Sequence, residues 1–389
     1  MIIPPSSRLD SVQEYYFSKK LREIDEMNKN GSKVINLGIG SPDLPPPLQT
    51  LNKTIESIQK DNSHGYQNYK GIPRLRNAFA SWYRKFYNVT VNPESEVLPL
   101  IGSKEGIFHI SMAFLNPGDE VLVPDPGYPT YASVTKLVGG IIQHYPLKEE
   151  NNWLPDFEEL QKRDLSKVKL LWVNYPHMPT GTKPTMQFFE SLVEFGRKNK
   201  ILICNDNPYS FILNDDPLSI LSVENAWEVA LELNSLSKSY NMPGWRIGMV
   251  LGAQHYITAV LQVISNIQSG MLLPLQEGAI AALEAPKSWF EEINGIYKER
   301  RRYAWDIFDE LGCEYNKDQS GLFIWGKIPE SEKDSIAISE KILIKSRVFI
   351  TPGQIFGNQG NKYLRISLCA NEEMFKDALN RIKNKLSNK

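Results

Sequence analysis

Seven short runs of mainly aliphatic and aromatic residues recur between residues 96 and 252. They cover residues 96–102, 120–126, 141–147, 168–174, 200–206, 229–235 and 245–252. Amphipathic stretches such as 105–115 and 185–199 lie between them, with apolar residues at helical spacing. Nearly continuous apolar strands that alternate with helices predict an α/β fold with a mostly parallel, seven-stranded sheet covered by helices on both faces.

The pattern changes near residue 287. A long charged amphipathic stretch, 287–312, precedes the shorter apolar runs "GLFIWGKI", "VFITPG" and "YLRISL", which have helical segments between and after them. This pattern predicts a smaller α+β domain, and the proline-rich "SPDLPPP" at 41–47 predicts the crossing between domains. We expect an N-terminal arm with part of the small domain (1–47), a large domain (48–275), and an interdomain helix with the small C-terminal domain (276–389).

Composition narrows the class of protein. The chain has 389 residues, 41% hydrophobic and 23% charged, with a formal net charge of −1, so it has no basic surface with which to hold nucleic acid. Three cysteines at no metal or redox spacing indicate a reducing compartment and no metal site. Because no run of about 18 apolar residues and no signal-like segment occur, we expect a cytoplasmic protein without a membrane partner.

Polar or glycine-rich segments follow five of the apolar runs. They are "GSKEG" at 102, "DPGYPTY" at 125, "NYPHMPTG" at 174, "NDNPY" at 205 and "SLSK" at 235. The carboxyl ends of parallel strands share one sheet edge, where ligands bind, so these segments should converge. Arg246 instead precedes its strand, and it reaches the same edge only if that strand runs antiparallel.

Several of these residues form a predicted anion site. Backbone N–H groups of Gly102 and Ser103, ahead of a helix expected from about 104, can bind an anion. Ser235, Ser237 and Arg246 add hydroxyl and guanidinium donors. Each group alone is more often part of a turn or a solvated charge, so the prediction depends on the combination.

Three further residues suggest which ligand carries the anion. Asp206 ends a buried strand, so its carboxylate requires a cationic partner such as a protonated ring nitrogen. Tyr128 offers a face for stacking an aromatic ring, and Lys238 offers an amine. A phosphate site, a ring-nitrogen partner, a stacking face and an amine together predict pyridoxal 5′-phosphate, held as a Schiff base on Lys238.

The segment "SLSKSYNMPGWRIG" around Lys238 resembles the cofactor-lysine segment of class I/II aminotransferases, the aspartate aminotransferase superfamily of fold type I. The similarity continues, in the family's order, through "NLGIGSPD", "GYQNYKGIPRLR", "GSKEG", "DPGYPTY", "PTG", "DNPY" and "YLRISL". It implies the fold-type I architecture, with amino acid and 2-oxo acid substrates and a homodimer with shared active sites.

The resemblance also implies roles for matching residues. Lys238 would hold the cofactor and then move the proton between the substrate Cα and the cofactor. Asp206 would keep the ring nitrogen protonated, and Tyr209 would bond the ring oxygen. The phosphate would be held by a set of donors from two subunits: Ser103, Lys104, Ser235, Ser237, Arg246 and, across the dimer, Tyr66. The substrate carboxylate would be bound by Arg365 in a bidentate fork and by the backbone at Gly40.

One position departs from the family. Met178 stands where an asparagine normally bonds the ring oxygen and the substrate carboxylate, and a thioether cannot donate a hydrogen bond. His177 and Asn174 are nearby candidates for that role. Alternation along an extended segment, however, sends His177 to the face opposite Met178.

We expect an aminotransferase with a neutral amino donor, aromatic or methionine-like. The stretch "SNIQSGMLLP" at 265–274 has no arginine or lysine where the aspartate-specific branch places an arginine for the distal carboxylate. The alternatives are a C–S β-lyase and an LL-diaminopimelate- or aspartate-type aminotransferase. A non-catalytic binding protein is disfavoured because the catalytic set is complete.

Overall fold

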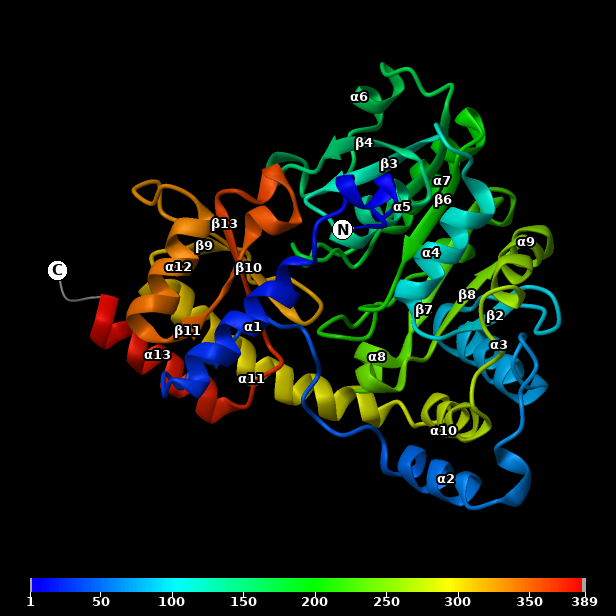
Figure 1. Cartoon of the computed structure of the whole chain (residues 1–389), viewed down its shortest axis with the longest axis horizontal. Coiled ribbons are helices and arrows are strands. Elements are labelled where there is room, and N and C mark those ends of the chain that lie inside the picture. The colour runs from blue at the N-terminus through cyan, green and yellow to red at the C-terminus, as the bar shows by residue number, and fades with distance from the viewer. Residues whose placement is uncertain (1, 387–389) are drawn as a thin grey trace.

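A computed structural model describes residues 2–386, which form two lobes of unequal size (Figure 1). The large lobe contains a seven-stranded sheet in the order β2-β8-β7-β6-β5-β3-β4. Its strands are β2 (Val97–Leu100), β3 (Glu120–Asp125), β4 (Ile141–Pro146), β5 (Val168–Val173), β6 (Leu202–Asp206), β7 (Ala230–Ser235) and β8 (Gly248–Gly252). All neighbours are parallel except β8, which runs antiparallel to both β2 and β7. The predicted sheet and the predicted reversal of the strand after Arg246 are therefore confirmed.

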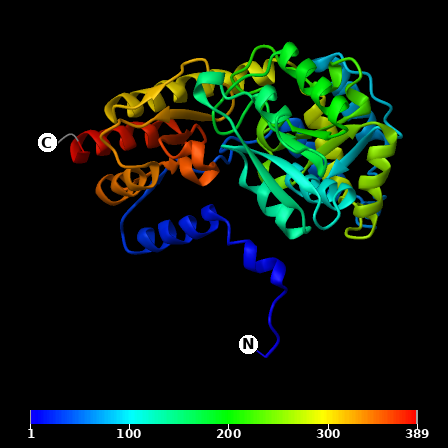
Figure 2. The same cartoon turned by 90° about the horizontal axis from the view of Figure 1, so that it is seen from above.

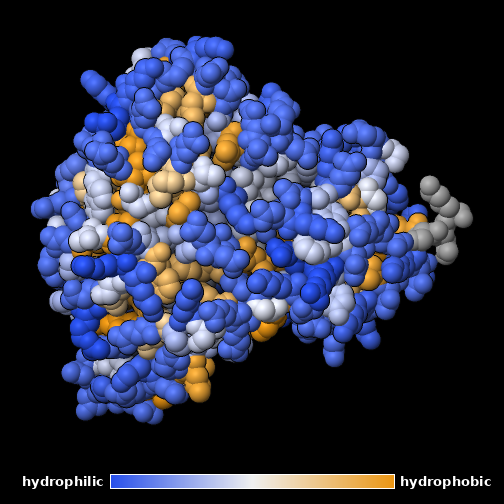
Figure 3. Space-filling view, turned by 180° about the vertical axis from the view of Figure 1, so that it is seen from behind, coloured by the Kyte–Doolittle hydropathy of each residue, from blue (hydrophilic) through white to orange (hydrophobic). Residues whose placement is uncertain are grey.

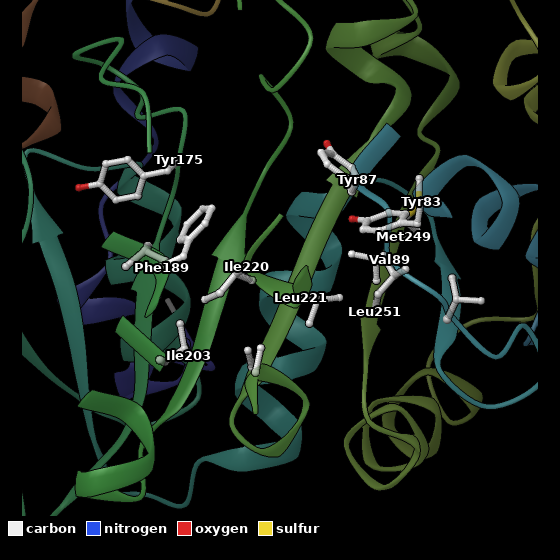
Figure 4. Packing of buried hydrophobic residues seen from close by; sticks show 14 of the residues in the cluster. Tyr83, Tyr87, Val89, Tyr175, Phe189, Ile203, Ile220, Leu221, Met249 and Leu251 are labelled. Atoms are coloured by element: carbon white, nitrogen blue, oxygen red, sulfur yellow. The ribbon is translucent and has the colours of Figure 1, made fainter. Parts of the chain in front are cut away.

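Helices cover both faces of this sheet. They are α2 (Leu48–Ile58), α3 (Pro73–Tyr87), α4 (Ser103–Phe114), α5 (Pro129–Leu137), α6 (Phe157–Gln161), α7 (Met186–Asn199), α8 (Leu236–Ser239), α9 (Gln254–Ser265) and α10 (Leu273–Leu283). Successive side chains of a strand point to opposite faces, so Leu171 and Ile203 pack with α3 and α7, while Leu170 and Leu202 pack with α4 and α9. Figure 4 shows the first of these clusters.

The limits of α7 illustrate how local sequence sets the elements. The Thr185 hydroxyl accepts a hydrogen bond from the Phe188 N–H at 3.1 Å, which caps the start of the helix. Lys200 adopts a left-handed backbone (φ 57°) and ends the helix two residues before β6 begins. Between these points the helix buries Phe189, Leu192 and Val193 against the sheet.

The small lobe combines a four-stranded antiparallel sheet with helices from both ends of the chain. Its strands are β9 (Glu314–Tyr315), β10 (Phe323–Lys327), β12 (Thr351–Pro352) and β13 (Tyr363–Ser367), with β1 (Ile35–Asn36) pairing in parallel with β11 (Val348–Phe349). Its helices are α1 (Tyr16–Lys29), α11 (Ser288–Glu310), α12 (Ser335–Ser346) and α13 (Glu372–Leu386). Phe17 and Ile35 share a core with Ile293 and Phe375, so the N-terminal segment packs into this lobe.

The junction between the lobes does not follow one sharp boundary. The helix α10 packs against α2 and α3, so the large lobe continues past residue 275. The predicted limits at 47 and 275 stay predictions. In Figure 2 the N-terminal arm and α1 lie to one side of both lobes. No helix in the described range is long and apolar enough to cross a membrane.

Candidate active site

A cavity of about 810 Å³ lies at the carboxyl edge of the large sheet, between the lobes. It is lined by eleven of the twelve predicted site residues: Gly40, Ser103, Lys104, Tyr128, Asp206, Tyr209, Ser235, Ser237, Lys238, Arg246 and Arg365. A second hollow of about 730 Å³ at the opposite sheet edge is lined by none of them. The strand order brings these segments together because Asp206 ends β6, Ser235 ends β7, and antiparallel β8 starts at the same edge.

Lys238 lies in α8, immediately after β7. Its Nζ donates a hydrogen bond to the Gly40 carbonyl oxygen at 2.6 Å. Burial lowers the pKa of Lys238; Cys369 opposes this decrease, and Arg365 and Arg246 add to it. A lysine with a lowered pKa has a larger fraction of free amine, the form that reacts with an aldehyde and accepts a proton.

The two carboxylate oxygens of Asp206 differ in their partners. Asp206 is 5% exposed, and its Oδ2 accepts from the Tyr131 hydroxyl at 2.9 Å. Its buried Oδ1 has no hydrogen-bond partner among residues 2–386. Burial raises the pKa of Asp206 to about 7, while Tyr131 and Lys238 lower it. An orphaned buried carboxylate oxygen suits a protonated ring nitrogen, so this observation fits the predicted cofactor.

Tyr131 contributes to the site, although the sequence pattern predicted no role for it. Its ring stacks on Trp172, with centroids 5.0 Å apart and planes 5° from parallel, which orients its hydroxyl towards Asp206. Tyr131 lies in α5, three residues after Tyr128 at the N-cap of that helix, and both residues line the cavity. That spacing in "YPTY" is the signal that would have identified Tyr131.

Residues of the predicted anion site lie together at the start of α4. Gly102 precedes the helix with φ 83°, and a Cβ there would lie 2.0 Å from Arg246 Nη2. The close approach of Arg246 to this helix N-terminus therefore requires glycine. Ser235 Oγ accepts from the Ser237 N–H at 3.1 Å and so also caps α8. Backbone N–H groups beside a guanidinium and hydroxyls suit a phosphate group.

Arg365 in β13 is 4% exposed and has no acidic partner within 4 Å in the described part of the chain. Its Nη2 donates to the Gly38 carbonyl at 2.7 Å, and its Nη1 lies 3.3 Å from Met178 Sδ. Burial lowers the pKa of Arg365 to about 10. Three phenyl rings surround the guanidinium, with centroids at 3.9 Å (Phe323), 4.6 Å (Phe356) and 5.5 Å (Phe17). A carboxylate ligand would supply the missing counter-charge.

Asn174, a neighbour of Met178, lines the cavity. Its amide donates one hydrogen bond to the Asp206 backbone oxygen and accepts one from the Met178 N–H at 2.8 Å, and an amide nitrogen carries a second N–H. His177 does not line the cavity, as expected, and its Nδ1 bonds Thr180 Oγ1 at 2.8 Å. Burial lowers the pKa of His177 to about 3.

Of the twelve predicted site residues, Tyr66 is the one that does not line the cavity, and Gly102, also predicted for the anion site, is not among the lining residues either. Tyr66 is 93% exposed within the single chain. Conversely, the sequence did not place the cavity residues Tyr15, Phe17, Ser18 and Leu21 of the N-terminal segment. Their amphipathic pattern predicts a helix with one apolar face but does not say which surface that face covers.

Comparisons with known proteins agree with this arrangement. A family model described as "Aminotransferase class I and II" matches residues 32–382. The chain is 40% identical over 381 residues to the LL-diaminopimelate aminotransferase of Dehalococcoides mccartyi (strain 195), covering 97% of this chain and 98% of that protein. It is 39% identical over 377 residues to the protein of that name from Natranaerobius thermophilus, covering 96% and 97%. The substrate-bound BacF structure from Bacillus subtilis matches with a TM-score of 0.93 at 36% identity, covering 99% and 98%.

Proposed function

Because the chain belongs to the class I and II aminotransferases, which use pyridoxal phosphate, we propose that its amino donor resembles LL-diaminopimelate. The chain is a pyridoxal-phosphate-dependent aminotransferase of fold type I. The substrate proposal is carried by similarity, over 97% of the chain, to aminotransferases named for LL-diaminopimelate. The comparisons support this alternative better than the neutral donor expected from residues 265–274.

The residues present fit the cofactor. The start of α4, with Ser237 and Arg246, would hold its phosphate, and the free Oδ1 of Asp206 would accept from its protonated ring nitrogen. Lys238 would be its covalent attachment. When bound, the cofactor supplies an electron-accepting ring that stabilises the negative charge left after a proton leaves the substrate Cα.

The side chains of the chain would perform the remaining steps. The lowered pKa of Lys238 favours its neutral amine, which can take the Cα proton and return it elsewhere. Arg365 would orient the donor by binding its α-carboxylate. Burial raises the pKa of Tyr209, so its hydroxyl stays protonated and can donate to the ring oxygen. The phenyl rings around Arg365 limit the access of water, which strengthens its attraction for a carboxylate.

Lys104 is the residue to which we assign the distal carboxylate of the donor. Its backbone belongs to the anion site, but its side chain lies elsewhere in the cavity, with Nζ 4.8 Å from the Tyr15 ring centroid. It has no acidic partner within 4 Å among the described residues. Burial and Arg246 lower the pKa of Lys104, and a carboxylate would compensate for both effects. Lys104 would thus supply the positive charge for the distal carboxylate that residues 265–274 lack.

Half-reaction rates test the proposed donor. The cofactor-loaded protein is mixed separately with LL-diaminopimelate, phenylalanine, methionine and aspartate, and conversion of the cofactor from its aldehyde to its amine form is followed by absorbance. We expect kcat/KM for LL-diaminopimelate to exceed the others by at least tenfold, which corresponds to about 1.4 kcal/mol of additional transition-state stabilisation. A higher value for phenylalanine or methionine would restore the neutral-donor hypothesis.

We also propose that the active unit is a homodimer. Exposed apolar residues lie on one face of α2 and in two loops: Leu48, Ile55, Ile58, Tyr66, Tyr69, Ile267 and Leu272. The loops adjoin, because a Cβ on Gly270 would lie 2.5 Å from the Gln67 backbone oxygen. Figure 3 shows apolar surface gathered mainly over the large lobe on the face that it draws. Such a surface suits burial against a second copy, which would bring Tyr66 to the partner's phosphate.

A further inference from the structure

One carboxylate of the large lobe is bound by backbone of the small lobe. β3 ends at Asp125, whose Oδ2 accepts from the Asn358 N–H at 3.1 Å and whose Oδ1 accepts from the Gln359 N–H at 2.9 Å. Two residues further on, the Gly127 N–H donates to the Phe356 carbonyl at 2.8 Å. Three hydrogen bonds thus join the end of β3 to residues 353–360, a loop between β12 and β13.

The loop is shaped around this carboxylate. Gly357 has φ 139°, which side-chain-bearing residues rarely adopt, and a Cβ there would lie 2.1 Å from Asp125 Oδ1. Asp125 is 8% exposed, and no cation lies within 4 Å of it in the range that the structure describes. The two loop N–H groups therefore provide the main stabilisation of the buried charge.

The same loop forms part of the substrate site. Phe356 lines the cavity, and its ring centroid lies 4.6 Å from the Arg365 guanidinium. On the other side of the contact, residues 125–128 lead to Tyr128, which also lines the cavity. The contact therefore links the backbone next to Tyr128, the predicted stacking residue, with the backbone at Phe356, whose ring lies beside Arg365.

We propose that Asp125 is a positioning residue that holds the loop 353–360 against the large lobe and thereby fixes Phe356 beside Arg365. The proposal rests on the role proposed above for Arg365 as the donor carboxylate site. Water can replace the two N–H donors at the carboxylate, so this contact can break and reform. Asp125 would then favour the arrangement in which Arg365 is enclosed and binds a carboxylate most tightly.

Asp125→Asn tests this role in the cofactor-loaded protein. The amide keeps the size of the side chain but loses the charge and one acceptor, so one loop N–H would face an NH₂ group. We expect KM for the amino donor, and Kd for a carboxylate competitor without an amino group, to rise about tenfold, with kcat changed less than threefold. Backbone N–H exchange at Asn358 and Gln359 should become faster. Asp215→Asn, at an exposed position, is the matched control and should change none of these values.

Gly357→Ala disturbs the same contact from the loop side, and it also serves if Asp125→Asn does not fold. Because both substitutions break one contact, the double variant should raise Kd no more than the stronger single variant. Unchanged N–H exchange in the single variants, or an unchanged Kd, would overturn the role of Asp125. An unchanged competitor Kd in Arg365→Leu would instead contradict the proposed role of Arg365, so the two failures are distinguishable.

Discussion

The burial of Asp206 suits it to a cationic ligand but lowers the free energy of unfolding of the cofactor-free protein at neutral pH. With its pKa raised to about 7 from an ordinary 3.8, the folded protein binds a proton that the unfolded chain releases between about pH 4 and 7. The free energy of unfolding of the cofactor-free protein should therefore fall as pH rises through this window, by about 4 kcal/mol at most. Asp206→Asn should lose this contribution.

We expect Asp206→Asn to gain Tm relative to wild type between pH 5 and pH 8 in the cofactor-free state. Scanning calorimetry of both proteins at the two pH values measures this difference. With cofactor bound, the variant should instead be the less stable protein at pH 8, because it cannot pair with the ring cation. Parallel pH curves for the two cofactor-free proteins would show that Asp206 titrates normally.

Lys104→Ala should weaken the binding of the distal carboxylate of the donor without weakening that of its α-carboxylate. If its amine binds the distal carboxylate, the variant should raise KM for LL-diaminopimelate about tenfold or more and change KM for methionine less than about twofold. Lys104→Arg keeps the charge and should recover most of the affinity. An equal loss for both donors would indicate a general effect on the anion site.

Met178→Asn addresses the departure from the family. An amide that donates to the ring oxygen stabilises its anion, so the pH midpoint of the visible absorbance change in the cofactor-loaded protein should fall by about one unit. Met178→Leu has no donor and should keep the wild-type midpoint. Identical midpoints in all three proteins would mean that another group already bonds this oxygen.

At the scale of elements, α1 covers the cavity and is anchored through a buried lysine. Lys20 is 7% exposed and pairs with Glu340 of α12 at 2.5 Å and with Glu23 at 2.7 Å. We expect Glu340→Gln to weaken the docking of α1 by about 1 kcal/mol, since Glu23 still neutralises the lysine. Limited proteolysis should then cleave α1 several-fold faster, with a higher KM for the donor.

The matched control for this prediction is Glu332→Gln. Glu332 pairs with Lys341 of α12 at 2.7 Å, an ion pair in which α1 takes no part. Its substitution should leave the cleavage of α1 unchanged. If both variants behave alike, the anchoring role of the Lys20 pair is wrong.

The elements that the sequence predicted best are those whose pattern has one structural explanation. The seven apolar runs became seven strands because a strand buried on both faces is apolar throughout, and the direction of β8 followed from the need to bring Arg246 to the site. The run "VFITPG" instead divides between β11, which pairs with β1, and β12, which pairs with β13. Its partners, like the surface beneath α1, depend on tertiary packing that periodicity does not encode.

In the candidate site, too, some residues could be predicted from the local sequence pattern and others depend on tertiary packing. Lys238, Asp206 and Arg246 line one cavity, as the sequence predicted, because each lies at or next to the end of a sheet strand on the same edge. Phe323 and Phe356 could not be predicted as site residues, because an apolar residue in a small-lobe segment is typical of a hydrophobic core. In this protein both residues belong to the small-lobe core and also line the cavity.

At the scale of the whole molecule, the exposed position of Tyr66 predicts subunit complementation. Lys238→Ala should lose activity by about 10²- to 10⁴-fold because it lacks the proton carrier. If Tyr66 reaches the partner subunit, a mixture of Lys238→Ala and Tyr66→Phe proteins should form heterodimers with one native site. The mixture should then exceed the average activity of its parents.

Subunit exchange in this mixture must be verified independently, for example with a mass-tagged copy. The two variants should each form a dimer alone, since neither removes the apolar residues of α2. Activity equal to the parental average after verified exchange would contradict a shared site.

The antiparallel strand β8 has a consequence for synthesis of the chain on the ribosome. β2 pairs only with β8 within the described sheet, in a register that sets Leu100 opposite Gly248 and brings the start of α4 to Arg246. Almost the whole large lobe must therefore emerge before this edge can form, and such distant pairing folds slowly. A nascent chain that ends before residue 248 would hold Asp206 and Lys238 but no complete phosphate site. Cofactor capture would thus be a late event that reports completion of the large lobe.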